Sequence, residues 1–378
     1  MLLGFNVNYV LSVQLGDIKG ELVLFDFFKE RTPPLIGVDI SSTTVKMVEL
    51  SGDGKSSIHL ESYSIAPLPR DAVVDGNIAS LENVGESVRR AWKLLNTREK
   101  NAAMALPAAA VISKKVNMQA GLSETEMELQ VEAEANQYIP FSLDEVNIDF
   151  QQLDPLPNSP ETVEVLIAAS KKERIEDRVA VAEDAGLKVV IMDVETYATE
   201  AAYSLAANQI PNAGREQTVM IVDVGAQMMH INVLHDNQSV YTREQPFGGS
   251  QLTQEIVRRY GLSAEEAEIA KRKGGLPENY ESEVLEPFVQ SMAMEIARAA
   301  QLFTNSTQFG IDHILLAGGC AAIPGAIEAV SARTRVNTIA ANPFVNMTIA
   351  KHIDKNQLAT DAPALMIACG LAMRRFEA

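Results

Sequence analysis

The sequence predicts an α/β protein that is built from two related halves. The main observation is a pattern that occurs twice, in which an apolar strand ends on an aspartate and is followed by a turn and a second strand. The first copy covers residues 35–50 with Asp39 before its turn, and the second covers residues 218–234 with Asp223 before its turn. Acid-then-turn sequences are ordinary hairpin chemistry, so one copy alone is weak evidence. Two copies together indicate a duplicated architecture.

Length and composition describe a globular protein with more than one core. A chain of 378 residues is long enough for two or three domains, and 47% apolar with 22% charged residues is typical of a folded chain. The formal net charge of −18 argues against nucleic-acid binding through a basic face and against general attraction to anionic lipid.

The cysteines and the apolar segments indicate in which cellular compartment the protein is expected. Cys320 and Cys369 lie in Ala-rich apolar segments and show no spacing typical of disulfide pairs. This fits reduced thiols in the core of a cytosolic protein and argues against a metal site built from cysteines. No apolar run reaches the roughly eighteen residues of a membrane-spanning helix. The first sixteen residues lack a basic start and a cleavage site, so we expect no signal peptide.

Residues 1–34 are predicted to form an N-terminal extension, of which residues 1 to about 21 are either a true extension or the result of a misplaced start. They close on the boundary signal Arg31-Thr32-Pro33-Pro34. Within them the apolar residues 22–28 are followed by charged residues. This stretch is either an amphipathic docking segment for a membrane or partner, or a short element packed on the body.

The first half begins with the hairpin of residues 35–50. A third strand is expected over residues 57–66, a helix over 81–95 and an apolar strand over 101–111. Residues 35–110, 191–215 and 342–378 are assigned to one subdomain, called 1A.

Residues 111–190 predict an inserted α+β subdomain with βαββαβ order. Its first helix starts at a capping box formed by Ser123 and Glu126 and stops near residue 138. Gly186 is predicted to end its second helix. The remaining elements are strands over 146–153, 163–168 and 189–192 and a helix over 171–185.

Residues 216–341 form the predicted second half, with subdomains 2A and 2B. A helix over 193–207 re-enters the first half before it. In the second half we expect helices over 251–260, 264–273 and 283–306 and a strand over 313–316. A last helix over 362–376 is expected to start near Asp361 as its cap.

The turn of the first hairpin is a candidate phosphate cradle. Ser41, Ser42 and Thr43 supply hydroxyls and backbone N–H groups at a strand end, and Lys46 supplies a point charge. Lys46 can equally lie on the exposed face of a strand.

Three acidic residues are candidates for metal-binding or catalytic roles near a bound phosphate. Asp39 and Asp223 are predicted to lie near Mg²⁺ and to act mostly through water, because Mg²⁺ sheds its hydration shell reluctantly. Alternatively, each is a turn-capping aspartate. Glu195 opens an Ala-rich helix, where it either positions a water for attack on a phosphate or complements the helix dipole. Glu195 and Asp223 are therefore the catalytic candidates.

Glycines and one charged helix complete the set of candidate binding residues. Gly318 and Gly319 follow an apolar strand and would let a ring or sugar approach the backbone, or simply form a tight turn. Glu268 and Lys271 would reach a ribose or base from the charged helix, unless that helix only presents a solvated face. The turn glycine Gly225 and the pair Gly248 and Gly249 are the remaining phosphate-side candidates.

The order of these motifs resembles the actin-like ATPase superfamily, which includes actin, heat-shock chaperones, sugar kinases and the bacterial division protein FtsA. Residues 37–46 resemble its first phosphate motif, residues 222–225 its second, residues 193–198 its connecting motif and residues 317–319 its adenosine motif. The resemblance covers residues 35–378. It implies two ribonuclease H-like halves that hold a nucleotide in the cleft between them.

More narrowly, the sequence is similar to the PilM family of FtsA-like proteins of type IV pilus assembly. Residues 40–46 (ISSTTVK), 138–141 (YIPF) and 193–195 (DVE) carry this similarity. The insert 111–190 sits where FtsA-like proteins carry subdomain 1C. The resemblance implies ATP with Mg²⁺ in the cleft and a groove beside the insert for the short cytoplasmic N-terminus of PilN. It also implies a place in the cytoplasm at the inner face of the inner membrane.

We therefore expect an ATP-binding adaptor of the pilus assembly platform. The superfamily usually continues its second phosphate motif with Gly and Thr, whereas Ala226, Gln227 and Met228 stand here, so hydrolysis is expected to be slow or absent. The alternatives are an FtsA-like filament-forming protein and, with less support, a small-molecule kinase. The chain stops directly after the fold, which favours PilM over FtsA.

Overall fold

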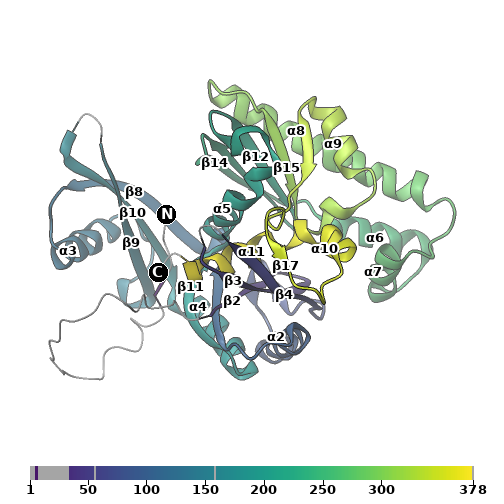
Figure 1. Cartoon of the computed structure of the whole chain (residues 1–378), viewed down its shortest axis with the longest axis horizontal. Coiled ribbons are helices and arrows are strands. Elements are labelled where there is room, and N and C mark those ends of the chain that lie inside the picture. The colour runs from purple at the N-terminus through teal and green to yellow at the C-terminus, as the bar shows by residue number, and fades with distance from the viewer. Residues whose placement is uncertain (1–4, 7–33, 55–56, 157–158, 377–378) are drawn as a thin grey trace. The chain divides into compact units, whose positions relative to one another are not determined.

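The computed structural model describes residues 5–6, 34–54, 57–156 and 159–376. Its contacts divide the chain into two compact units (Figure 1). The first contains Met1–Thr199 and Ile367–Ala378, and the second contains Glu200–Met366. The chain passes from one unit to the other within helix α5 (Glu195–Ala206) and again at the start of helix α11 (Met366–Met373).

The first unit is built on a sheet with strand order β1-β11-β7-β2-β3-β4. Strands β2, β3 and β4 pair antiparallel, β7 joins β2 in parallel, and β11 joins β7 in parallel. The strands are β1 (Phe5–Asn6), β2 (Ile36–Ile40), β3 (Thr44–Gly52), β4 (Ile58–Pro67), β7 (Asn101–Leu106) and β11 (Lys188–Val194).

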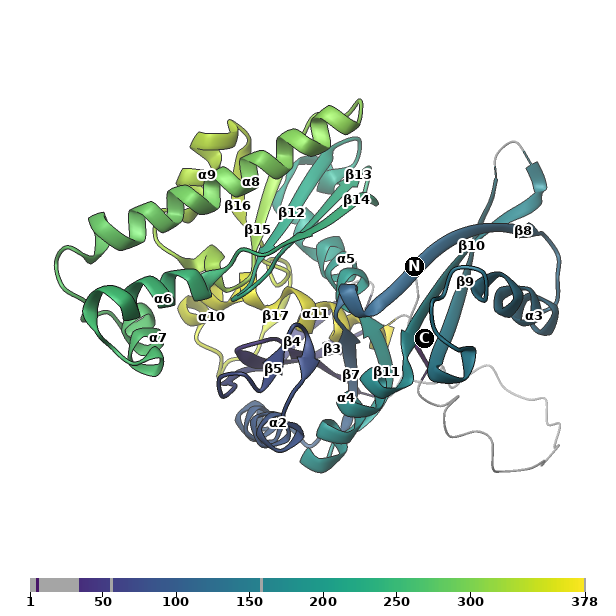
Figure 2. The same ribbon diagram turned by 180° about the vertical axis from the view of Figure 1, so that it is seen from behind.

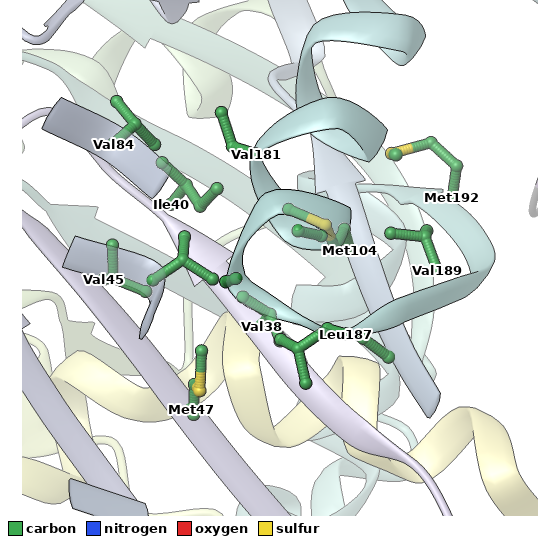
Figure 3. Close-up of a cluster of buried hydrophobic side chains, with 14 of the residues drawn as sticks. Val38, Ile40, Val45, Met47, Val84, Met104, Val181, Leu187, Val189 and Met192 are labelled. Carbon is green, nitrogen blue, oxygen red and sulfur yellow. The ribbon is translucent and has the colours of Figure 1, made fainter. Parts of the chain in front are cut away.

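All five residues of β2 are buried, as expected for the central strand of a sheet that is covered on both faces. On one face, Val38 and Ile40 pack with Met104, Val181 and Met192 in a cluster that includes helices α2 (Leu81–Leu95) and α4 (Lys172–Ala185) (Figure 3). The opposite face carries a smaller apolar group from α5 and α11. The C-terminal ends of β2, β7 and β11 therefore lie along one edge between these layers.

A separate three-stranded sheet has the order β8-β10-β9, with β8 (Val111–Gln119), β9 (Val146–Leu156) and β10 (Ser159–Lys171). Helix α3 (Glu124–Ala135) begins at the predicted capping box and lies beside this sheet in both views (Figures 1 and 2). The predicted βαββαβ order is found. However, α4 packs against α2 and β11 joins the larger sheet, so the separate sheet ends at Lys171.

The second unit has a sheet with the order β14-β13-β12-β15-β16. Helices α8 and α9 lie side by side over this unit in both views. The strands are β12 (Thr218–Val224), β13 (Met229–His235), β14 (Gln238–Gln245), β15 (His313–Ala317) and β16 (Asn337–Ala340), and the helices are α6 (Gly249–Tyr260), α7 (Ala264–Lys273), α8 (Glu286–Ser306) and α9 (Ala326–Thr334).

The two units repeat one topology. In the second unit β12, β13 and β14 pair antiparallel, while β15 and then β16 are added in parallel. The first unit has the same arrangement in β2, β3 and β4 followed by β7 and β11. The predicted duplication is thus confirmed. Each copy places an aspartate, Asp39 or Asp223, near the end of its first strand.

The prediction for the last helix was wrong at its start. Asp354 is the N-cap, because its side chain accepts hydrogen bonds from the backbone N–H groups of Asn356 and Gln357. Helix α10 (Lys355–Asp361) then runs through a short 3₁₀ segment into α11. Asp361 therefore lies inside the helical stretch. The cap was overlooked because polar residues separate Asp354 from the apolar run that begins at Ala362.

Other differences concern short elements. The sequence did not predict the hairpin of β5 (Val73–Val74) and β6 (Asn77–Ile78) or strand β17 (Thr348–Ile349). The predicted docking segment 22–28 lies outside the described residues. Among the described residues no helix is long and apolar enough to span a membrane.

Candidate functional site

In the first unit, Asp39 and Lys46 form an ion pair across the first hairpin. They stand opposite each other in the antiparallel register of β2 and β3, and Lys46 Nζ lies 2.8 Å from Asp39 Oδ2. The Asp39 side chain is 2% exposed and that of Lys46 is 14% exposed. Lys46 therefore does not lie on an exposed strand face. The hairpin instead presents a charge pair behind its turn.

The turn itself is closed by Ser41. Its hydroxyl donates to the backbone oxygen of Thr44 at 2.9 Å, and its N–H donates to the same oxygen at 3.0 Å. Ser42 and Thr43 lie at the tip and are half-buried. Of the predicted cradle residues, Ser41 thus shapes the turn, while Ser42 and Thr43 lie at its tip and are only partly covered.

Glu195 lies at the first position of α5, directly after β11. Both Glu195 and Asp39 interact electrostatically with one buried cation, Arg178 of α4. Burial lowers the pKa of the Arg178 guanidinium, and the negative charges of Glu195 and Asp39 oppose that shift. The structure therefore places two of the predicted acids in the field of the same arginine.

Arg178 is a residue that sequence reasoning missed. It is 2% exposed and donates to the backbone oxygens of Ala105 at 3.0 Å, Gly76 at 2.8 Å and Arg174 at 3.3 Å. The available signal was its position: Arg178 falls on the apolar stripe of α4, three residues after the buried Ile175. An arginine on such a stripe must find partners inside the protein.

In the second unit, hydrogen bonds join the predicted glycine motifs. The oxygen of Gly225, in the turn after β12, accepts from the N–H of Gly249 at 3.0 Å and from the thiol of Cys320 at 3.5 Å. The next oxygen, of Ala226, accepts from the N–H of Ser250 at 2.8 Å. The turn that follows Asp223 is thereby tied to the N-terminus of α6 and to the segment after β15.

Two of these glycines are required by the packing of the chain itself. A Cβ at Gly318, which has a φ of +80°, would lie 2.4 Å from the oxygen of Val224 and 2.5 Å from Asp223 Oδ1. A Cβ at Gly248 would lie 2.5 Å from the oxygen of Ala226. Around a Cβ at Gly319, by contrast, no atom is found within 4 Å in the described part of the chain. Gly319, unlike Gly318 and Gly248, is therefore not required by contacts with its described neighbours.

The charged helix α7 contributes to the same cluster. Lys271 Nζ lies 2.6 Å from Glu268 Oε1, 2.8 Å from Thr253 Oγ1 and 3.5 Å from the oxygen of Gly249. Burial alone would raise the pKa of Glu268, but the charge and hydrogen bond of Lys271, together with the Thr253 hydrogen bond and the charge of Arg272, lower the pKa overall. The Lys271 side chain is 17% exposed, so this part of α7 packs against α6 and is not simply a solvent-exposed face.

The described residues contain no group of three or more His, Cys, Asp or Glu side chains suited to hold a metal ion. Asp39 and Asp223 belong to different units, and Asp39 already has Lys46 beside it. Both cysteines are free and buried, and burial raises the pKa of the Cys320 thiol to about 12. Any Mg²⁺ would thus depend on water and ligand oxygens.

Two sheets of the same five-strand topology, each with an aspartate ahead of its first turn, define the protein as one with an actin-like fold. The chain belongs to the PilM family. The model of that family, described as type IV pilus assembly protein PilM, matches residues 37–376.

Solved structures agree with this assignment. The protein is similar to a structure described as a PilM-PilN type IV pilus biogenesis complex, with 25% identity over 92% of this chain and 100% of that chain and a TM-score of 0.76. The ethanolamine utilization protein EutJ from Carboxydothermus hydrogenoformans is 17% identical over 90% of this chain and 89% of that chain, with a TM-score of 0.54. The diol dehydratase-reactivating factor is 9% identical over 91% and 100%, with a TM-score of 0.51. The last two support the fold alone.

Proposed function

We propose that this chain is a nucleotide-binding adaptor of type IV pilus assembly, which binds ATP with Mg²⁺ and holds the N-terminal cytoplasmic segment of PilN. It would act in the cytoplasm at the inner face of the inner membrane through its partners. The observation that carries the nucleotide part is the second-unit cluster, in which Gly225, Gly249, Cys320 and Lys271 are in contact.

The described residues fit an adenine nucleotide in their chemistry. The N-terminus of α6 offers a positive dipole end, and Ser42, Thr43 and Lys46 offer hydroxyls and charge of the kind that phosphate oxygens accept. Glu268 and Lys271 are suited to the ribose, and the space beside Gly319 to the flat base. Asp39 and Asp223 keep their proposed role beside Mg²⁺, through water, and Glu195 that of orienting a water.

We propose slow or absent hydrolysis. A turn that bears a hydroxyl can hold a reacting phosphate or water, whereas the residues after Gly225 are Ala226, Gln227 and Met228. The oxygen of Ala226 is occupied by Ser250, and the oxygen of Met228 accepts from Gly225. The turn is therefore shaped by internal bonds and carries no hydroxyl of its own.

The PilN part of the proposal is supported by family membership and by the complex to which the chain is similar. Its test is a titration of a fluorescein-labelled peptide with the sequence of the PilN N-terminus from the same organism, followed by fluorescence anisotropy. We expect saturable binding with a Kd on the order of micromolar, and none for a scrambled peptide of equal composition. Equal signals from both peptides would contradict the adaptor.

A further inference from the structure

Arg178 is a buried cation that lies where the central strands of the first unit end. It belongs to helix α4, and Val181, one turn further along that helix, packs with Met104 of β7 (Figure 3). Arg178 Nε donates to the backbone oxygen of Ala105, the next residue of β7, at 3.0 Å. The guanidinium therefore lies at the C-terminal end of β7.

Strand β7 separates two of the candidate acids. It lies between β11 and β2 in the sheet. On the β11 side Ala105 stands opposite Asp193, two residues before Glu195, and on the β2 side the parallel pairing ends one residue before Asp39. Neighbouring strands lie about 4.8 Å apart, so a cation bonded to β7 acts on charges at both neighbouring strand ends.

Two further hydrogen bonds fix Arg178 in place. Its Nη2 donates to the oxygen of Gly76 in the β5–β6 hairpin at 2.8 Å, and its Nη1 donates to the oxygen of Arg174 at 3.3 Å. A Cβ at Gly76, which has a φ of +73°, would lie 2.8 Å from Cγ of Pro107, so the hairpin packs just beyond the end of β7. Arg178 is 2% exposed and bonded through all three guanidinium nitrogens, which makes it a fixed charge.

The charge of Arg178 acts on carboxylates that it does not bond directly, because all three hydrogen bonds go to neutral backbone oxygens. Burial lowers the pKa of the guanidinium, and among the charges that act on it that of Glu195 is the strongest and opposes the shift. Arg174 acts against Glu195, while Asp177 and Asp39 act with it. Since the attraction is mutual, Arg178 stabilises the Glu195 carboxylate.

Asp39 has a second cation, Lys46, and the two cations differ in their freedom to move. Lys46 Nζ lies 2.8 Å from Asp39 Oδ2, and the Lys46 side chain is 14% exposed. A phosphate at the hairpin turn would attract this ammonium. Asp39, whose side chain is 2% exposed, would then lose its bonded cation, at a cost that a second, fixed cation reduces.

We propose that Arg178 is a positioning residue of the nucleotide site, a fixed counter-charge for Glu195 and Asp39 that allows Lys46 to turn from Asp39 to the phosphates of a bound nucleotide. The role toward Lys46 rests on the proposed function. The charge balance between Arg178 and Glu195 is a property of the protein without any ligand.

The first test is a double-mutant cycle of Arg178→Gln and Glu195→Gln in the nucleotide-free, full-length protein. The single tryptophan of the chain, Trp92, lies on α2, so its fluorescence follows the urea unfolding of the unit that holds both residues. Glu195→Gln should lower the urea midpoint of the wild type and raise that of the Arg178→Gln variant, because a carboxylate without its counter-charge is then removed. We expect the two shifts to differ by at least about 0.3 M.

The matched control is Glu176→Gln, which removes an exposed carboxylate of α4 and should shift the midpoint equally in both backgrounds. If Arg178→Gln alone yields no folded protein, addition of Glu195→Gln should restore folding and addition of Glu176→Gln should not. A double variant of Arg178 and Glu195 that stays unfolded would overturn the charge balance. Equal shifts by Glu195→Gln in the two backgrounds would overturn it as well.

The second test is a calorimetric titration of ATP with Mg²⁺ into the variants Arg178→Lys and Arg178→Gln. Lysine keeps the positive charge and glutamine does not, while neither reproduces the hydrogen bonds of the guanidinium. We expect the Kd to rise at least about ten-fold in Arg178→Gln and at most about three-fold in Arg178→Lys. Equal losses of affinity would show that Arg178 is only structural and would overturn its role as a positioning residue.

The two tests separate this proposal from the proposed function. If the wild-type protein binds no ATP while Glu195→Gln shifts the two midpoints in opposite directions, the proposed function is contradicted and the role toward Lys46 falls with it. The charge balance of Arg178 and Glu195 is supported by that same result.

Discussion

Two arginine–aspartate pairs in the first unit show how burial sets the value of an ion pair. Arg374 Nε lies 2.7 Å from Asp193 Oδ2, and Arg89 Nη2 lies 2.7 Å from Asp184 Oδ2. The exposed fractions of the side chains are 2% and 0% in the first pair and 51% and 64% in the second. The two pairs have the same N–O distance and differ only in burial. The buried pair cannot lose one partner without leaving a charge away from water.

We therefore expect Arg374→Met to lower the free energy of unfolding by about 3–5 kcal/mol. The matched variant Arg89→Met should lower it by at most about 1 kcal/mol, because its pair is solvated. Urea unfolding followed by circular dichroism compares the two variants. Equal losses would show that burial does not set the worth of these pairs.

Asp149 of β9 predicts a pH dependence of stability. Burial raises its pKa to about 6 from 3.8, and the hydrogen bond from the Phe150 N–H only partly opposes this. The folded state thus binds the proton more tightly than the unfolded state. The stabilisation is present below about pH 4 and is lost as the pH rises through 6.

Asp149→Asn removes this titration. At pH 7.5 we expect the free energy of unfolding of the variant to be about 1–2 kcal/mol higher than that of the wild type. At pH 4 we expect the two values to be equal. The exposed Asp144→Asn serves as a control. Chemical denaturation at both pH values is the measurement, and a stability difference that does not change with pH would count against the buried carboxyl.

At the scale of elements, helix α11 approaches its neighbours through glycines. A Cβ at Gly37 of β2 would lie 2.0 Å from the oxygen of Ala368, and a Cβ at Gly370 would lie 1.7 Å from the oxygen of Ala198 in α5. Both distances are far shorter than a van der Waals contact. The backbone of α11 therefore packs directly on β2 and α5, next to Asp39 and Glu195.

Gly370→Ala gives two opposite expectations. Helix propensity alone predicts a gain of about 1 kcal/mol, whereas the close approach predicts a loss of about 3 kcal/mol or more. We expect the loss, as a lower Tm in differential scanning calorimetry. At Gly310 a Cβ would meet no atom of the described residues within 4 Å, so Gly310→Ala is the control. A higher Tm for Gly370→Ala would refute the tight packing.

Elements with local signals could be predicted from the sequence. Helices α2 and α7 were predicted with their observed bounds, and the capping box of Ser263 and Glu266 explains the second case. Features that depend on distant residues could not. Arg374 meets Asp193 only through the fold, and the two-residue pairing of β1 with β11 leaves no periodic pattern.

For the candidate site, the sequence provided candidate residues in each half. The structure brings Gly225, Gly249 and Lys271 together in the second unit and sets Asp39 against Lys46 in the first. It also adds Arg178, which no motif marks. Their roles toward a nucleotide and the subdomain boundaries stay predictions.

At the scale of the whole molecule, two copies of one topology form a chain that belongs to the PilM family. The duplicated aspartate-and-turn motifs and the second-unit glycine cluster are the features on which the proposed nucleotide binding rests. The formal net charge of −18 makes the local cations, such as Lys46 and Lys271, more important for any anionic ligand.

The most direct test of this account is a calorimetric titration of ATP with Mg²⁺ into the nucleotide-free protein. We expect a Kd of about 10 μM or tighter, weakened at least about ten-fold by Lys271→Ala and unchanged by Lys273→Ala, an exposed lysine of the same helix. Absence of binding to the wild-type protein, or equal effects of the two variants, would contradict the nucleotide site.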